Sequence, residues 1–249
     1  MRPAVGLIGY GRFGRLAAHH IQEEADVLVY EPRKSARPAR TGRVRRASLR
    51  KAASQPVVVL TVPISSLRSV AKEIRPHLQR GAVVVEVCSV KVQPLRWLRE
   101  ILPRHVAIIG THPLFGPDSV KGSLANHHLV ICPARARRVH VQVLERLARS
   151  RRLKLHRMSP AKHDRLVADT LLLSQYLGRL LVSARIQEHV WSAPSYEHLR
   201  ELVRIARNDS DQLFADMWRY NQYSARIGQS LRRAHQTLMR AARTGRVDS

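Results

Sequence analysis

The feature that most constrains the fold is a glycine-rich turn directly after the first apolar run. The run Ala4–Ile8 is followed by GYGRFG (residues 9–14), and a helical pattern begins inside this turn. In a strand–turn–helix unit, the first glycine permits the tight turn, the second lets phosphates approach the backbone, and the third lets the helix pack on the strand. The helix N-terminus adds unpaired N–H groups and the positive end of its dipole. We therefore expect the chain to begin with a Rossmann-type dinucleotide-binding unit.

Short apolar runs rich in β-branched residues alternate with helical stretches through the first 150 or so residues. The runs are Ala4–Ile8, Val27–Tyr30, Val57–Val62, Ala82–Val87, Val106–Thr111 and His128–Cys132. This alternation predicts an α/β fold with a parallel sheet covered by helices on both faces. Val57–Leu60 is apolar at every position, as expected for a strand buried on both faces. We predict a Rossmann domain over residues 1–157.

The pattern becomes purely helical after Met158. Ser159 and Pro160 resemble an N-cap followed by proline at the first helical position, and this helix is expected to reach about Trp191. A shorter helix is expected from Pro194 to about Arg207, before a final long helix. That final helix carries an apolar seam with alternating spacings of four and three, at Leu213, Met217, Tyr220, Ser224, Ile227, Leu231, Ala234, Leu238 and Ala241. We predict a smaller all-helical domain over residues 158–249.

The apolar surface of this helical domain has two interpretations. The final helix packs either against the helix that begins after Met158 in the same subunit, or against a second subunit. Apolar residues nearly surround the first helix, which therefore needs more cover than one small domain provides. We accordingly predict a homodimer formed through the C-terminal helices.

Composition restricts the classes of partner. The formal net charge is +26, and most of the 44 basic residues are arginines spread along the chain, with one dense stretch from Arg33 to Lys51. Few aromatic residues accompany this stretch, so it offers no stacking platform for single-stranded nucleic acid, and nucleic-acid binding is not predicted as the main function. A positive field instead favours the approach of an anionic substrate and cofactor.

Neither a membrane span nor a signal peptide is predicted, because no apolar run is long enough and the N-terminus lacks the required layout. The two cysteines, Cys88 and Cys132, are too few for a disulfide framework, which fits a reducing compartment. We expect a cytoplasmic protein, and we predict no metal site.

The second predicted strand ends in Glu31, where a ribose-binding acid belongs in a dinucleotide site. Glu31 can accept hydrogen bonds from both ribose hydroxyls of NAD and would repel the 2′-phosphate of NADP, whereas Arg33 and Lys34 would attract that phosphate. We favour NAD and leave NADP as the alternative. The residues assigned to the cofactor are Gly9, Gly11, Arg12, Phe13, Gly14, Glu31, Thr61 and Pro63.

Two polar residues follow neighbouring predicted strands. Ser89 follows the fourth strand and His112 follows the fifth, at the carboxyl ends where open α/β sheets bind their ligands. Hydride transfer from an alcohol carbon needs a group that accepts the hydroxyl proton, and histidine suits this task near neutral pH. An ordinary loop histidine at position 112, and a helix cap at position 89, are the alternatives.

These residues lie within the motifs CSVK (residues 88–91) and GTHPLFGP (110–117), and the chain later carries HDR (163–165), RIA (204–206) and DS (209–210). Together these motifs resemble those of the prephenate/arogenate dehydrogenases. The resemblance implies oxidative decarboxylation of a cyclohexadienyl substrate, with hydride leaving ring C4 for the nicotinamide and the ring carboxylate departing as carbon dioxide. It further implies that His112 accepts the hydroxyl proton and that Ser89 holds that hydroxyl and the nicotinamide amide.

The resemblance also suggests substrate-binding residues in the helical domain. Arg204 would hold a substrate carboxylate, although an ion pair with Glu201 is nearly as well supported by the spacing. His163 has either a structural or a substrate-side role. Twelve residues beyond it, many family members carry a histidine, whereas this chain has Gln175. Asp209 either binds the ammonium that distinguishes arogenate from prephenate or caps the last helix.

Two other functions stay open from the sequence. One is a different Rossmann dehydrogenase acting on a hydroxy acid, which would often use a lysine of the helical domain, where only Lys162 is available. The other is a non-catalytic nucleotide- or nucleic-acid-binding regulator, against which the Ser89–His112 combination argues.

Overall fold

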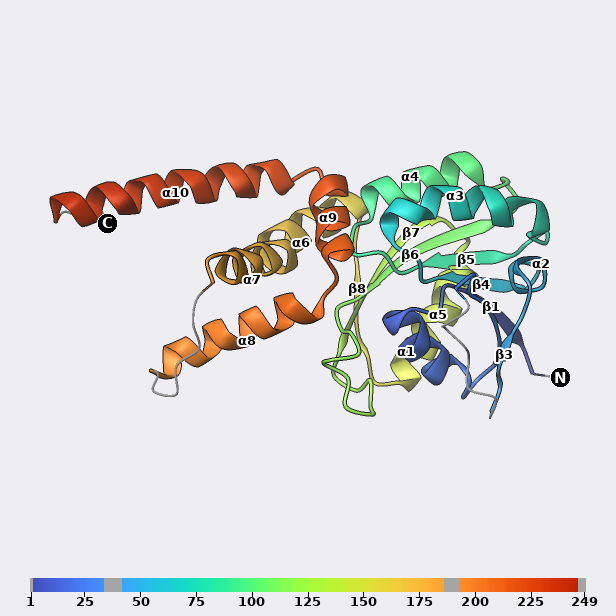
Figure 1. Cartoon of the computed structure of the whole chain (residues 1–249). Helices are drawn as coiled ribbons and strands as arrows, with labels where there is room; N and C mark the ends of the chain where they lie inside the picture. Colours follow the sequence, from blue (N-terminus) through green and yellow to red (C-terminus); the bar gives the residue numbers. More distant parts are fainter. Residues whose placement is uncertain (1, 34–41, 186–192, 246–249) are drawn as a thin grey trace. The chain divides into compact units, whose positions relative to one another are not determined.

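The computed structural model describes residues 2–33, 42–185 and 193–245 of the chain (Figure 1). The chain divides into two compact units, Met1–His163 and Asp164–Ser249. This division lies within helix α6 (Pro160–Val167), a few residues after the boundary expected from sequence at residue 158. Of the basic stretch from Arg33 to Lys51, residues 34–41 lie outside the described residues, and this includes Lys34.

The first unit contains an eight-stranded sheet with the order β3-β2-β1-β4-β5-β6-β7-β8. The strands are β1 (Ala4–Ile8), β2 (Asp26–Tyr30), β3 (Val44–Arg46), β4 (Val57–Leu60), β5 (Val83–Glu86), β6 (Ala107–Pro113), β7 (His128–Arg135) and β8 (Lys154–Arg157). All neighbours are parallel except β6 and β7. The six predicted strands are all present. The sequence did not predict β3 and β8, which are short, polar edge strands without an apolar pattern.

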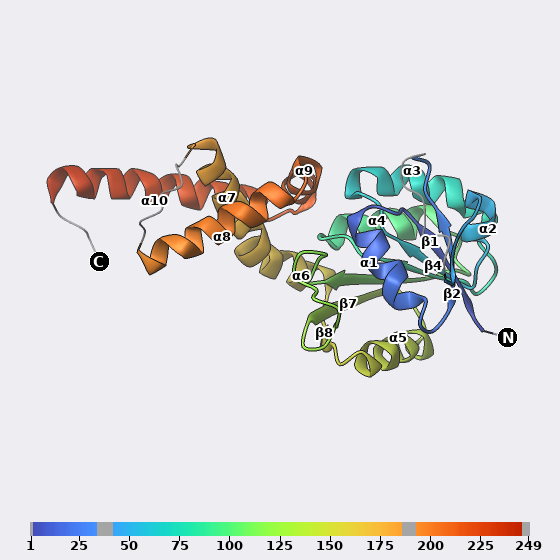
Figure 2. The ribbon, with the colours of Figure 1, turned by 60° about the horizontal axis from the view of Figure 1, so that its bottom comes forward.

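Helices cover both faces of this sheet, as predicted (Figures 1 and 2). Helices α1 (Arg12–Ile21) and α5 (Arg138–Ser150) lie on one face, whereas α2 (Leu49–Ala53), α3 (Ile64–Ile74) and α4 (Val92–Ile101) lie on the other. A short 3-10 turn, η1 (Arg75–His77), follows α3. The core under α1 and α5 is formed by alternate strand residues, including Leu7, Val27, Val29, Ile109 and Ile131. Burial on both faces keeps the carboxyl ends of the strands at a fixed edge.

The second unit is helical, but its helices are shorter than predicted. The segment expected as one helix to about Trp191 is α6, a π-helical turn η2 (Ala168–Leu172) and α7 (Leu173–Ser183). The chain leaves the helix at Arg185, whose φ is +51°. Residues 186–192, including Trp191, lie outside the described residues. A π-helical turn is rare and is enclosed by helix on both sides, so the helical periodicity of the segment did not reveal this interruption.

The predicted final helix is also interrupted. After α8 (Pro194–Asn208), the chain forms α9 (Asp211–Tyr220) and α10 (Ser224–Thr244). Asn221 causes the break, because its Oδ1 accepts from the backbone N–H of Tyr223 at 2.9 Å and its Nδ2 donates to the Asp164 carbonyl at 2.8 Å. Asparagine side chains that bond local backbone groups compete with helix continuation. The prediction of one continuous helix was therefore wrong.

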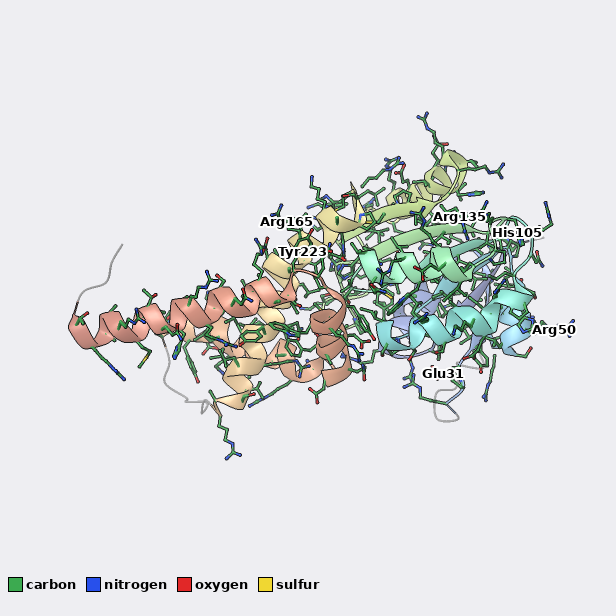
Figure 3. The ribbon with its side chains drawn as sticks, turned by 90° about the horizontal axis from the view of Figure 1, so that it is seen from above. Glu31, Arg50, His105, Arg135, Arg165 and Tyr223 are labelled. Carbon is green, nitrogen blue, oxygen red and sulfur yellow. The ribbon has the colours of Figure 1, made fainter. Side chains whose placement is uncertain are left out.

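Close packing holds this unit together. A Cβ on Gly178 of α7 would lie 2.7 Å from the Ala206 Cβ and 2.8 Å from the Leu202 carbonyl oxygen, so glycine is needed for the approach of α7 to α8. Val167, Leu172 and Met217 form a small core. At its edge, Arg165 lies over the ring of Tyr223, 5.9 Å from the centroid (Figure 3). No helix in the described ranges combines the length and apolar character needed to cross a membrane.

Candidate active site

The glycine-rich turn has the geometry that its sequence predicts. Gly9 has a φ of +98°, and a Cβ there would lie 2.6 Å from the Thr61 carbonyl oxygen. A Cβ on Gly14 would lie 2.5 Å from the Gly9 carbonyl oxygen, so α1 packs directly on the turn. By contrast, the one described group that a Cβ on Gly11 would meet is the Arg33 guanidinium, at 3.7 Å. The space over Gly11 thus suits a phosphate group rather than protein atoms.

The N-terminus of α1 faces this space. Gly11 is its N-cap, no side chain in the described part of the chain caps the helix, and no acidic residue lies in its first turn. The first backbone N–H groups of a helix have no partner within the helix. With the positive end of the helix dipole, these groups suit an anion.

Glu31 is buried at the end of β2, next to the turn (Figure 3). Its Oε2 accepts from the Tyr10 backbone N–H at 2.8 Å, and its two oxygens accept from Arg33 Nε at 2.8 Å and Nη2 at 3.0 Å. The hydrogen bonds from Arg33 are the main cause that lowers the pKa of Glu31 to about 2. Glu31 is therefore negatively charged at physiological pH, and the Arg33 guanidinium lies against its carboxylate.

The other residues assigned to the cofactor surround the same turn. Thr61 Oγ1 donates to the Gly9 carbonyl at 2.8 Å, so Thr61 braces the turn. Arg12 pairs with Asp118 at 2.6 Å, and the Phe13 ring lies 6.5 Å from that of Phe115. These contacts join the start of α1 to the loop after β6. Pro63 is the exposed N-cap of α3.

His112 lies near the end of β6 and is 5% exposed. Its Nδ1 is 2.8 Å from the Nε2 of His163, which is 1% exposed on α6. Burial, followed by the nearby His163 and Lys91, lowers the pKa of His112 well below 6.5. His112 is therefore a neutral imidazole at physiological pH, the form that accepts a proton. His163, for which the sequence left a structural and a substrate-side role open, lies against His112.

Ser89 is half-buried in the bend between β5 and α4. The N-cap of α4 is Lys91, so the alternative that Ser89 caps this helix does not hold. Sequence reasoning missed two fully buried ionisable residues on either side of Ser89, namely Glu86 and Lys91, which form an ion pair. The available signal was the placement of a charged residue directly at the end of the apolar run 83–85, because buried charges in proteins are paired.

Three of the predicted substrate residues lie in the helical unit. Gln175 and Asp209 bond to each other, whereas Arg204 pairs with Glu201. Gln175 is 2% exposed, and its Nε2 donates to Asp209 Oδ2 at 2.6 Å. The Oε1 of Gln175 is buried, and no donor among the described residues reaches it. The N-cap of α9 is Ser210, whose Oγ accepts from the Leu213 N–H at 3.2 Å, so Asp209 is not the capping residue. Arg204 forms a two-pronged, exposed ion pair with Glu201 at 2.6 and 2.7 Å.

Comparison with known proteins identifies the family. Residues 27–154 match the family described as "Prephenate dehydrogenase, nucleotide-binding domain". The chain belongs to this family. The resemblance inferred from CSVK and GTHPLFGP is thereby confirmed.

Individual members of the prephenate dehydrogenase family extend this result. Arogenate dehydrogenase 2, chloroplastic, of Arabidopsis thaliana is 31% identical over 171 residues, which are 66% of this chain and 48% of the relative. The chain spans about half or less of the length of the first curated relatives that it matches.

Solved structures confirm the fold class. Prephenate dehydrogenase from Aquifex aeolicus, in complex with hydroxyphenyl propionate and NAD+, superimposes with a TM-score of 0.77 at 18% identity, covering 98% of this chain and 92% of that one. Synechocystis arogenate dehydrogenase gives a TM-score of 0.71 at 20% identity, covering 97% and 92%. A Rossmann-type domain followed by a helical region is therefore the fold of this chain.

Proposed function

We propose that this protein catalyses the nicotinamide-dependent oxidative decarboxylation of arogenate, prephenate or both, a step of tyrosine biosynthesis. The observation that carries this proposal is the buried, neutral His112 at the carboxyl edge of the same sheet as the glycine-rich turn. Membership of the prephenate dehydrogenase family supports it. Hydride transfer from an alcohol carbon requires a proton acceptor and a dinucleotide site close together, and a neutral histidine and a glycine-rich turn on one sheet edge can provide them.

The residues of the glycine-rich turn fit a dinucleotide. Gly11 and the uncapped start of α1 would hold the pyrophosphate, and Glu31 would accept hydrogen bonds from the adenosine ribose. Since Arg33 now occupies both oxygens of Glu31, binding requires it to move aside. The fixed negative charge of Glu31 favours NAD over NADP. The nicotinamide, when bound, supplies the acceptor for the hydride.

At the reacting ring, His112 takes the proton of the C4 hydroxyl while Ser89 orients that hydroxyl. As the C4–H bond breaks, its electron pair leaves as hydride. The hydroxyl then becomes a carbonyl, and the bond to the ring carboxylate breaks to release carbon dioxide. The electron pair of that bond enters the ring and forms an aromatic phenolate, which takes the proton back from His112. His163 holds the His112 ring through its Nδ1, which leaves the opposite nitrogen, Nε2, to accept the proton.

Recognition of the substrate's other groups is assigned to the helical unit. Arg204 is proposed to bind a carboxylate, exchanging its exposed partner Glu201 for the substrate. Asp209 and the Oε1 of Gln175, which no described donor reaches, are both acceptors, and an ammonium group is a donor with three hydrogens. We therefore propose that arogenate is accepted at least as well as prephenate.

Exposed apolar residues of α10 bear on the oligomeric state. Helix α10 exposes Leu238 (62%) and Met239 (46%), an apolar surface that a second subunit would cover. We propose a homodimer through the C-terminal helices, acting in the cytoplasm.

The deciding experiment is nicotinamide reduction followed at 340 nm with prephenate and arogenate, each in the presence of NAD and of NADP. Arogenate with NAD is expected to give the highest kcat/KM. Absence of reduction in all four combinations, with a folded protein, would overturn the proposed activity.

A further inference from the structure

A fully buried ion pair lies between the strand ends that carry Ser89 and His112. Glu86 is the last residue of β5 and Lys91 precedes α4, and both are 0% exposed. The Nζ of Lys91 donates to Glu86 Oε1. Removing two charges from water costs free energy that their attraction often fails to recover, so a buried pair is weak evidence for a role in stability alone.

The pair bonds to the backbone next to both proposed site residues. Lys91 Nζ also donates to the Thr111 carbonyl at 2.6 Å, directly before His112. Glu86 Oε2 accepts from the Cys88 backbone N–H at 2.8 Å, directly before Ser89. Thr111 Oγ1 completes the link by donating to the Glu86 carbonyl at 2.9 Å. The ends of β5 and β6 are thus tied together through charged groups.

The surrounding packing fixes the carboxylate of Glu86. A Cβ on Gly110 would lie 2.8 Å from Glu86 Oε1 and 2.8 Å from Leu95 Cδ1. A side chain at position 110 of β6 would therefore push against Glu86 and Leu95, whereas glycine leaves room for the pair.

We propose that Glu86 and Lys91 are positioning residues, which set the alignment of Ser89 and His112 and supply a balanced charge pair beneath His112. In the proposed function, on which this inference rests, His112 must stay neutral and aimed at the substrate hydroxyl. The pair would serve both needs without contacting the substrate or the cofactor.

The charges that face His112 make this proposal measurable. His163 faces it from α6 and Lys91 from the start of α4, with Glu86 of β5 paired to Lys91, while its β7 partner is the apolar Val130. The positive charge of Lys91 disfavours a protonated His112, and the negative charge of Glu86 opposes this effect. Loss of Lys91 and loss of Glu86 should therefore shift the pKa of His112 in opposite directions.

Histidine-labelled protein observed by NMR provides the test, with His112→Asn used to assign the His112 signal. Lys91→Met should raise the pKa of His112, and Glu86→Gln should lower it, each by about half a pH unit or more. The double variant Glu86→Gln/Lys91→Met should lie between the two. Lys72→Met, an exposed lysine of α3, is the matched control and should produce no shift.

Kinetics on the same proteins test the positioning role. In the double variant, which leaves no unpaired buried charge, kcat should fall about tenfold or more while KM changes by less than about threefold. Lys91→Arg should not restore kcat, because the guanidinium cannot reproduce both bonds of the ammonium.

The results distinguish failure of the proposed activity from failure of the Glu86–Lys91 role. If wild-type protein reduces no nicotinamide, the proposed function fails, whereas the pKa shifts still test the charge pair. If both single variants shift the pKa in one direction, or neither shifts it, the charge-balancing role is overturned. Should a single variant fail to fold, the double variant decides, and wild-type kcat in a folded double variant would refute positioning.

Discussion

The Nδ1 atom of His112 lies 2.8 Å from the Nε2 atom of His163, and the two rings meet at 67°. Because both rings are buried and both atoms are nitrogens, one must donate and the other accept. In the arrangement where His112 donates, its Nε2 keeps a lone pair and can act as a base. In this arrangement His163 orients the His112 ring.

Replacing His112 tests its role as proton acceptor. His112→Asn should lower kcat by about a hundredfold or more, a loss of the size expected for a general base, with a smaller change in KM. Steady-state kinetics with arogenate and NAD provide the measurement. His105→Asn, at an exposed position before β6, is the control and should retain wild-type turnover. Wild-type turnover in His112→Asn would remove His112 from the mechanism.

The lowered pKa of His112 predicts how stability depends on pH. The native state resists protonation of His112, whereas the unfolded state takes up a proton near pH 6.5. The free energy of unfolding should therefore be unaffected by this group above pH 6.5 and fall as the pH drops below it, by at most about 1.4 kcal/mol per pH unit. Urea titrations of wild type and His112→Asn at several pH values give the difference. Parallel pH profiles for the two proteins would contradict this prediction.

We expect Glu31 to determine the preference for NAD over NADP. Glu31→Ser should lower the ratio of kcat/KM for NAD to that for NADP by about tenfold or more, because it removes the ribose acceptor and releases Arg33 for a 2′-phosphate. Since the pKa of Glu31 is about 2, the wild-type ratio should not change between pH 6 and pH 9. Glu100→Ser, on the exposed face of α4, is the control. An unchanged ratio in Glu31→Ser would show that Glu31 does not contact the ribose.

We expect the charge of Asp209 to favour arogenate over prephenate. Asp209→Asn should lower the arogenate-to-prephenate ratio of kcat/KM by about tenfold, or 1.4 kcal/mol, because it deletes the charge that an ammonium requires. The hydrogen bond from Gln175 is retained, since asparagine still offers an oxygen. Ser210→Ala is the matched control, because loss of the α9 cap should cost about 1 kcal/mol of stability without changing the ratio. A constant ratio in Asp209→Asn would place Asp209 away from the ammonium.

The exposed face of α10 predicts the oligomeric state. Wild-type protein should scatter light as a dimer of 28.3 kDa subunits. Leu238→Arg should give a folded monomer, because Leu238 is 62% exposed in the single chain and a charge there harms only a contact with a second subunit. Gln236→Arg, on another face of the same helix, should stay dimeric. A monomeric wild type at micromolar concentration would refute the dimer.

Local stereochemistry and periodicity could be recognised from the amino-acid sequence alone. Gly9 and Gly14 must be glycines wherever the chain turns so tightly, so the turn could be recognised without a structure. The six predicted strands were visible because burial on both faces demands continuous apolar runs. His112 and Ser89 were found because strand ends in such sheets are where ligands bind.

Which of these residues contact one another depends on the packing of the folded chain. The pairing of His112 with His163 joins positions 51 residues apart, and the link from Lys91 to Thr111 joins positions 20 apart. No sequence period encodes such contacts, because they arise when strands and helices pack around a shared core. The antiparallel direction of β7 also depends on a distant partner, because an apolar pattern is the same for either strand direction. The helix break at Asn221 depends on the Asp164 carbonyl, to which the Asn221 side chain donates.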